Sequence, residues 1–99
     1  MKNLTIKNLT EVCSGTYHGP ENVMDREVSS ITTDSRKIEK DSLFVPIVGE
    51  RVDAHRFIPD VMSKGALVTL SERELENADF PYIQVGSSLQ AVKDIAEFY

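Results

Sequence analysis

The sequence lacks several features that would assign it to a membrane-bound, secreted or disulfide-bonded class. Its single cysteine, Cys13, can form no internal disulfide and has no partner for a cysteine-based metal site. No segment approaches the roughly 18 consecutive apolar residues of a transmembrane helix, and the N-terminal MKNLTIKNLTEV has no apolar core of a signal peptide. These absences predict a reduced, cytoplasmic protein with no membrane partner.

Positive charge is scarce as well. Lysine and arginine total 11 against 16 acidic residues, which gives a formal net charge of −5. Because a general nucleic-acid-binding surface needs a positive field, we expect no nucleic-acid partner, although a local pocket for one phosphorylated molecule stays compatible. The 99 residues suit one compact domain with a modest core, which we expect to be a monomer.

Catalytic signatures are also absent. The sequence contains no GxxxxGK[ST] phosphate loop and no GxGxxG, GxSxG or HExxH motif. His18 and His55 lack a partner pattern for a metal, and Cys13 lies on the apolar side of a predicted helix, which is typical of a small core residue. We therefore predict no catalytic residue and no metal site in this chain.

Apolar runs and turn signals predict an α/β fold. Strands that alternate with helices indicate a small mixed sheet flanked by helices, and the segment 43–70 is typical of a strand–helix–strand crossover. A short helical turn is predicted for the polar segment 71–80. The predicted strands are 16–18, 28–32, 43–48, 66–70 and 82–85, and the predicted helices are 5–15, 56–64 and 87–99.

The last helix carries the clearest local signals. Ser87 and Gln90, three residues apart, match a capping box at its start. It reaches the final residue without a C-cap signal, which favours a chain that is part of a longer protein. Glycines at 15 and 65 are predicted to end the two earlier helices. The predicted apolar stripe of the last helix is Leu89, Val92, Ala96 and Tyr99, with Ile95 beside it.

Residues 33–37, TDSRK, place polar side chains at the end of a predicted strand. Asp34 can hold a turn through its side chain, while Thr33 and Ser35 can donate and accept hydrogen bonds. Arg36 carries a planar donor fork that suits phosphate or carboxylate. Two interpretations stay open: a turn with an exposed arginine, which the local sequence favours, and a polar shelf for an anionic ligand.

A second polar segment, GERVDAH at 49–55, lies where another predicted strand ends and a helix begins. In α/β sheets, ligands collect beyond the carboxyl ends of strands and at helix N-termini. Asp53 is predicted at or near the N-cap of that helix, where it can serve the helix alone. Two polar loops on one edge of a sheet predict a recognition site rather than a catalytic one.

Four short motifs occur in a fixed order over residues 33–66: TDSRKI, SLFVPIVGER, DAHRFI and KGA. This series resembles the N-terminal domain of the Mur ligases, ATP-dependent enzymes that build the peptidoglycan stem peptide. GER followed by DxH is most similar to the MurF type, which adds D-alanyl-D-alanine. The sister type, which adds the third amino acid, shares the DSR and the Leu-Phe strand but usually differs at the GER triplet.

The resemblance implies that residues 1–99 form the single N-terminal domain of a three-domain ligase and bind the UDP end of UDP-MurNAc-tripeptide. It further implies that catalysis, ATP and Mg²⁺ belong to a central ATPase domain of the parent chain, which leaves this fragment without a cofactor. Arg36 is expected to support its loop or to approach the diphosphate. The substrate-binding residues that the resemblance implies are Thr33, Ser35, Arg36, Gly49, Glu50, Arg51 and Val52.

Two positions depart from the family pattern. Ala54 stands where the family usually has glycine, so its backbone must be helical or extended. Asp41 replaces a glycine before the Leu-Phe strand and can adopt the left-handed region better than most residues. Three alternatives stay open: the sister ligase, the same fold with another ligand, and a non-catalytic module whose polar loops bind a protein partner.

Overall fold

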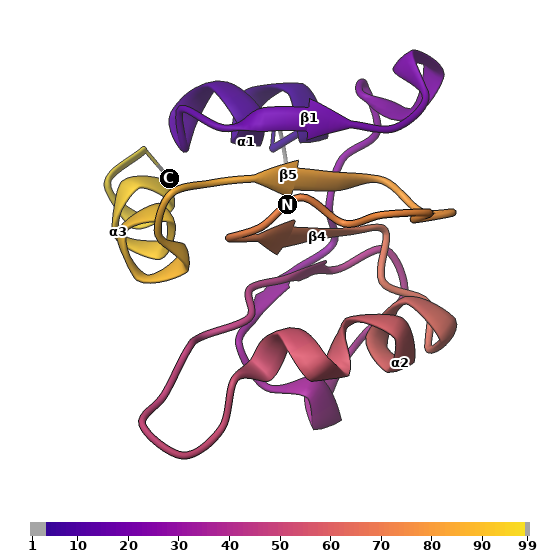
Figure 1. The fold of residues 1–99 in the computed structure, drawn as a ribbon. Helices are drawn as coiled ribbons and strands as arrows, with labels where there is room; N and C mark the ends of the chain where they lie inside the picture. Colours follow the sequence, from indigo (N-terminus) through magenta and orange to yellow (C-terminus); the bar gives the residue numbers. More distant parts are fainter. Residues whose placement is uncertain (1–3, 99) are drawn as a thin grey trace.

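The strands form where short apolar runs lie between turns, and they pair into one five-stranded sheet (Figure 1). They are β1 (Thr16–His18), β2 (Ile31–Thr32), β3 (Leu43–Phe44), β4 (Val68–Ser71) and β5 (Tyr82–Gln84). The computed structural model describes residues 4–98. The order across the sheet is β1-β5-β4-β3-β2. Strand β1 is antiparallel to β5, and all other neighbours are parallel, which confirms the predicted mixed sheet.

The described residues form α-helices α1 (Ile6–Val12), α2 (Ile58–Ser63) and α3 (Ser88–Phe98), and short 3-10 helices η1 (Glu21–Val23), η2 (Ser35–Lys37) and η3 (Ala54–Phe57). The α/β class is therefore confirmed. Within residues 4–98, every helix is too short or too polar to cross a membrane.

Successive residues of β3 and its extension face opposite layers. Leu43 and Val45 belong to the core cluster that contains residues of α1 and α3, whereas Phe44 packs with Ile58 and Val61 of α2. This alternation has the period of two that a strand imposes on its side chains. Helices α1 and α3 therefore cover one face of the sheet and α2 covers the other, so ligand access is left to the sheet edges.

The chain reverses at the ends of α1 and α2 through residues with positive φ. Gly65 ends α2 as predicted, with a φ of 111° and a hydrogen bond from its N–H to the carbonyl of Met62. At the end of α1, Ser14 rather than Gly15 takes the positive φ, 53°. A Cβ at Gly15 would lie 2.6 Å from Cγ2 of Ile83, so this glycine permits close packing against β5.

Both departures from the family pattern adopt the predicted backbone conformations. Asp41 has a φ of 64°, in the left-handed region that an aspartate tolerates better than most residues. Ala54 is the first residue of η3 and has no positive φ. The turns before β3 and after the 49–53 segment therefore form without the family glycines.

Several predicted element bounds are wrong. Segment 71–80 contains turns but no helix. Leu75 and Phe80 pack against the cluster of Phe44, Ile58 and Val61, but five residues apart they would not share one face of a helix. The Leu75 N–H donates to the Tyr82 hydroxyl at 2.9 Å. The predicted strand 43–48 shortens to Leu43–Phe44, since Pro46 has no N–H for a ladder. The second helix begins as the 3-10 turn η3 before it becomes α2.

The predicted apolar stripe of α3 is also wrong. The buried residues of this helix are Ser88, Ala91 and Ile95, whereas Leu89 is 57% exposed. Small residues at 88 and 91 let the helix approach the core closely, so the helix turns this side inward. Of the predicted stripe, Val92 is half-buried and Ala96 exposed, and Tyr99 lies outside the described residues. The cap itself is confirmed, because the Gln90 N–H donates to Ser87 Oγ at 3.1 Å.

Candidate functional site

The carboxyl ends of the four parallel strands lie along one edge of the sheet, on the left in Figure 1. We call it the carboxyl edge. Both polar segments predicted from the sequence start there, one after β2 and the other after β3, and a third segment leaves β4 at 72–73. Parallel topology therefore brings together residues that are far apart in the sequence.

The turn after β2 is built by Asp34. Its Oδ1 accepts hydrogen bonds from the backbone N–H of Arg36 at 2.9 Å and from Arg36 Nε at 3.1 Å, while Oδ2 accepts from Arg36 Nη2 at 3.1 Å. These side-chain and backbone hydrogen bonds from Arg36 lower the pKa of Asp34 to about 2. The predicted turn is confirmed, and the guanidinium of Arg36 is committed to it.

Thr33 and Ser35 differ from Asp34 because their hydroxyls are unpaired. Thr33 is exposed and Ser35 half-buried, and neither hydroxyl bonds to another of the described residues. The backbone around them is held by the Asp34 N–H, which donates to Thr32 Oγ1 at 3.0 Å. The Ser35 carbonyl lies 3.5 Å from Lys64 Nζ, so η2 runs back beside the end of α2. A fixed turn thus presents two free hydroxyls.

The segment after β3 forms a short hairpin, residues 48–53. Val48 and Asp53 pair as an isolated antiparallel bridge, and the Gly49 N–H donates to the Val52 carbonyl at 2.9 Å. A Cβ on Gly49 would lie 3.2 Å from that carbonyl oxygen, which favours glycine at this tight turn. Glu50, Arg51 and Val52 are exposed, and Arg51 has no ion pair among residues 4–98.

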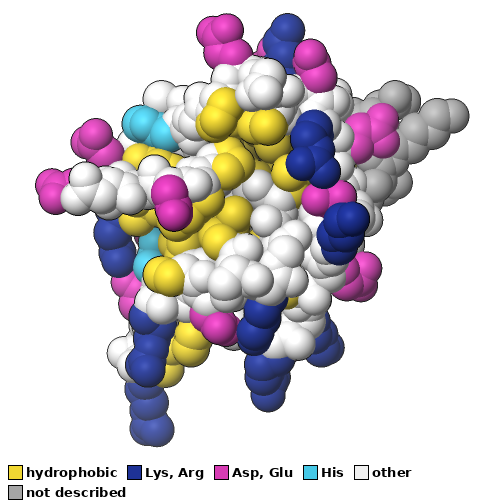
Figure 2. All heavy atoms as spheres, turned by 90° about the vertical axis from the view of Figure 1, so that its right-hand side faces the viewer, with side chains coloured by type: hydrophobic (Ala, Val, Ile, Leu, Met, Phe, Trp, Pro, Cys, Tyr) yellow, Lys and Arg dark blue, Asp and Glu magenta, His cyan; other side chains and the backbone are white. Residues whose placement is uncertain are grey.

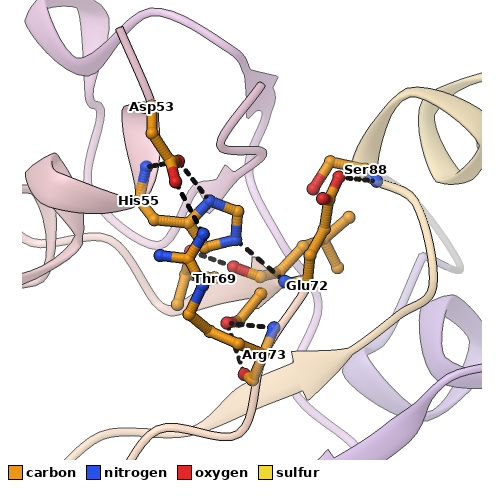
Figure 3. A network of polar contacts seen from close by, with 8 residues as sticks. Asp53, His55, Thr69, Glu72, Arg73 and Ser88 are labelled. Atoms are coloured by element: carbon orange, nitrogen blue, oxygen red, sulfur yellow. Dashed lines mark hydrogen bonds and ion pairs between the residues drawn. The ribbon is translucent and has the colours of Figure 1, made fainter. Parts of the chain in front are cut away.

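The base of this hairpin is held by Asp53. Its Oδ1 accepts from the His55 backbone N–H at 2.9 Å and lies 2.7 Å from His55 Nδ1, while Oδ2 accepts from Arg73 Nη2 at 2.6 Å (Figure 3). The Arg73 guanidinium, followed by the backbone N–H of His55, lowers the pKa of Asp53 well below its usual range. The predicted N-cap is confirmed, but the carboxylate has further partners.

The hydrogen bonds continue from this base across the edge. His55 is buried, and its Nε2 accepts from the Glu72 backbone N–H at 2.8 Å. The Glu72 carboxylate in turn accepts from the Ser88 N–H, at the start of α3, at 2.7 Å (Figure 3). We call these residues the carboxyl-edge network: Asp53, His55, Glu72, Arg73 and Ser88.

The sequence predictions missed three members of this network. The sequence pattern predicts a helical turn for 71–80, which hides Glu72 and Arg73 as the residues that follow a strand. Ser88 lies inside the predicted capping box of the last helix, between Ser87 and Gln90. Glu72 and Arg73 nevertheless directly follow a buried strand, which is the signal that singled out the other two loops. Strand ends should therefore be compared as a set in an α/β sequence.

The two predicted loops share an edge but do not touch through polar groups. Among residues 4–98, no hydrogen bond or ion pair joins segment 33–36 to segment 49–52. Cavities of about 590, 260, 370 and 380 Å³ are lined by other residues. The largest lies at the opposite, amino edge of the sheet, where apolar side chains gather in Figure 2. None of these four cavities is lined by residues 33–36 or 49–52, so these two loops lie on an open surface, although the cavity of about 370 Å³ reaches His55.

The carboxyl edge exposes hydrogen-bonding and charged groups. It offers the hydroxyls of Thr33 and Ser35, backbone groups of the hairpin, and the guanidinium of Arg51. Among the described residues, no group of three acidic, histidine or cysteine side chains could hold a metal ion. Burial, with a smaller effect of Asp94, raises the pKa of the Cys13 thiol to about 11, which suppresses its thiolate.

Curated relatives from two enzyme groups match this chain. "UDP-N-acetylmuramoyl-tripeptide--D-alanyl-D-alanine ligase" of Bacillus subtilis is 32% identical over 97 residues, which cover 96% of the chain and 21% of that protein. "UDP-N-acetylmuramoyl-L-alanyl-D-glutamate--2,6-diaminopimelate ligase" of Cytophaga hutchinsonii is 44% identical over 79 residues, covering 76% of the chain and 16% of that protein. The chain thus spans about a fifth of the length of these relatives.

Solved structures and a family model agree with these relatives. MurF from Acinetobacter baumannii superposes with a TM-score of 0.84 and 28% identity, over 96% of this chain and 20% of that one. MurF ligase from Thermotoga maritima, solved in complex with ADP, gives a TM-score of 0.62 and 28% identity, over 70% of this chain and 16% of that one. Residues 27–99 match the model described as "Mur ligase family, catalytic domain". The chain therefore belongs to the Mur ligase family.

Proposed function

We propose that this chain binds the UDP end of UDP-MurNAc-tripeptide for a ligase that adds D-alanyl-D-alanine during peptidoglycan synthesis. The observation that carries the proposal is the carboxyl edge, where two polar loops follow neighbouring parallel strands. Within residues 4–98, the side chains of Thr33, Ser35 and Arg51 form no hydrogen bond or ion pair. An edge of this kind is where α/β sheets bind nucleotides.

Each loop residue has a distinct part in this proposal. The hydroxyls of Thr33 and Ser35 contact the nucleotide, and Gly49 and Val52 give the hairpin the shape that admits uracil and ribose. The guanidinium of Arg51 can donate hydrogen bonds to phosphate oxygens, while the Glu50 carboxylate can accept a hydrogen bond from a ribose hydroxyl. We assign Arg36 to the support of its own turn, where Nε and Nη2 donate to Asp34.

The proposal treats residues 1–99 as the N-terminal domain of a three-domain parent. The matched family model is described as a catalytic domain, yet the sequence contains no GxxxxGK[ST] loop, so we assign ATP, Mg²⁺ and amide bond formation to the rest of the parent. An open edge also suits a site completed by another domain. The D-alanyl-D-alanine branch is preferred because its relatives match nearly the whole chain.

A titration of the ¹⁵N-labelled chain with UDP tests the proposal directly. We expect amide shifts to cluster on 33–36 and 49–55, with weak binding, since one domain supplies only part of the contacts. ADP is the matched control, because it differs in the base alone. Shifts that are absent, that cluster at the amino edge, or that ADP reproduces would contradict nucleotide recognition by uracil.

A protein partner is the second candidate. Val48 and Val52, on either side of the hairpin tip, are 50% and 46% exposed, and exposed apolar side chains in a loop suit a protein contact. The same titration separates the candidates: a hairpin that serves only a protein partner shows no saturable response to UDP. The Val52→Ser substitution would then weaken binding of the protein partner, whereas Ser35→Ala would leave that binding unchanged.

A further inference from the structure

Strand β4 occupies the centre of the sheet, between β3 and β5, and the two residues that follow it contact both neighbours. On the β3 side, the Glu72 N–H donates to His55 at 2.8 Å and Arg73 pairs with Asp53 at 2.6 Å. On the β5 side, the Glu72 carboxylate accepts from the Ser88 N–H at 2.7 Å. The central strand end therefore holds the hairpin and the start of α3 together (Figure 3).

The hydrogen bonds also assign the tautomer of His55. A backbone N–H can only donate, so Nε2 accepts from Glu72 and carries no proton. The ring proton of the neutral imidazole is then on Nδ1, which donates to the Asp53 carboxylate at 2.7 Å. His55 therefore accepts one hydrogen bond, from the Glu72 amide, and donates one, to the Asp53 carboxylate.

The hairpin has few other contacts that fix its direction. Within the described part of the chain, its tip has only the internal Gly49–Val52 hydrogen bond, and its base adds the bond from the Ala54 N–H to the Ile47 carbonyl at 3.2 Å. The side chains of Glu50, Arg51 and Val52 are exposed. The angle at which the tip leaves the sheet is therefore set at the base, where Asp53 and His55 lie.

We propose that Asp53 and His55 are positioning residues, which hold the hairpin tip at the angle that nucleotide binding requires by anchoring it to Glu72 and Arg73. This inference rests on the proposed UDP site, but it concerns residues that do not contact the ligand themselves. The affinity for the nucleotide then depends on Glu72 and Arg73, which follow β4 and contribute no contact to the ligand.

Paired substitutions of His55 test this role. In His55→Asn, the amide can still donate to Asp53, but nothing accepts the Glu72 N–H. In His55→Gln, the longer side chain can carry a carbonyl oxygen to the Glu72 N–H. We expect UDP to bind roughly tenfold more weakly to the asparagine variant, as for one lost buried hydrogen bond, and glutamine to restore most of the affinity.

The Thr5→Ala variant is the matched control. Thr5 caps α1 through a 3.1 Å bond from the Asn8 N–H, away from the carboxyl edge, so its loss lowers stability without touching the hairpin. We expect its dissociation constant for UDP to equal that of the original chain at a similar loss in melting temperature. Equal weakening in Thr5→Ala and His55→Asn would overturn the proposal, as would unchanged affinity in His55→Asn.

Two further measurements keep the inference separable from the proposed function. If the original chain does not bind UDP, the proposed function fails, and the ligand-free spectra decide the positioning role. Amide shifts and faster exchange at 49–52 in His55→Asn but not in Thr5→Ala support it, and unchanged amides overturn it. If His55→Asn does not fold, the Arg73→Gln variant replaces it, because the Arg73 side chain is exposed. We then expect weaker UDP binding and altered amides at 49–52 in Arg73→Gln but not in Thr5→Ala, and unchanged affinity and amides would overturn the proposal.

Discussion

Asp34 and Asp53 build two turns with the same local geometry. The angles φ and ψ are −104° and 114° at Asp34 and −99° and 110° at Asp53, and each residue caps a 3-10 helix. Each carboxylate accepts at 2.9 Å from the N–H two residues further on, and each binds an arginine. The arginines differ in origin: Arg36 lies within its turn, whereas Arg73 follows another strand.

This difference separates a self-contained turn from an anchored one. The hydrogen bonds of the Asp34 carboxylate lie within residues 34–36, and the Arg36 side chain is 86% exposed, so this carboxylate serves its own turn. The contacts of Asp53 reach the buried His55 and the end of β4. Loss of Asp34 should therefore act locally, and loss of Asp53 should act on the packing between strand ends.

The Asp53→Ala substitution is the strongest way to break this comparison. It removes a helix cap, worth about 1 kcal/mol, and leaves the buried Nδ1–H of His55 without an acceptor, which costs about 1 kcal/mol more. We expect the free energy of unfolding to fall by about 2 kcal/mol, measured by urea denaturation followed by circular dichroism. A loss no larger than that of Asp34→Ala would show that the remote contacts contribute nothing.

The Arg73→Ala substitution isolates the remote arginine. It leaves the cap and the His55 contact in place and removes an ion pair whose two side chains are 54% and 36% exposed. Such a pair contributes about 0.5 kcal/mol, so we expect a stability loss well below that of Asp53→Ala. A double-mutant cycle with Asp53→Asn measures the coupling between the two side chains, and zero coupling would contradict the anchored turn.

Acid titration compares the two carboxylates in one experiment. Both have a pKa below the ordinary 3.8, about 2 for Asp34 and lower for Asp53. A lowered pKa in the folded state means that the stabilisation is fully present above 3.8 and is lost as the pH falls from there through the folded value. We expect the urea midpoint to decline between pH 4 and 2, and Asp53→Asn to flatten this decline more than Asp34→Asn.

The Arg36→Ala substitution should have the smallest effect. The guanidinium is almost wholly exposed, and the Asp34 carboxylate keeps its bond to the backbone N–H of residue 36. We expect no measurable change in melting temperature and no change in the dissociation constant for UDP. Weaker UDP binding with unchanged stability would instead show that Arg36 contacts the ligand, as the family resemblance implies for this residue.

The same contrast explains what the sequence could and could not predict. The Asp34 turn and the Asp53 cap depend on neighbours within a few residues, so local chemistry was sufficient. The left-handed Asp41 was expected from the family pattern, and its N–H donates to the Gly65 carbonyl, far along the chain. The pairing of Asp53 with Arg73 depends on strand order, which brings residues 20 positions apart into contact. No local pattern around Arg73 contains that information.

The predicted apolar stripe of helix α3 is wrong for a related reason. Its sequence has apolar residues on more than one side, so periodicity alone cannot say which side meets the core. The side that meets the core carries Ala91 and Ile95, because the small side chains of Ser88 and Ala91 let the backbone approach α1 and the sheet. Leu89, the largest aliphatic residue of the predicted stripe, is left exposed.

The antiparallel pairing of β1 with β5 has a consequence for folding order. Neighbouring parallel strands in this sheet are consecutive in the chain, but β1 must find a partner near the other end, and His18 and Gln84 bond across 66 residues. Closing so long a loop costs more entropy than any other pairing in the sheet. We expect β1 to join last during folding and to open first in native-state amide exchange, before any strand that ends at the carboxyl edge.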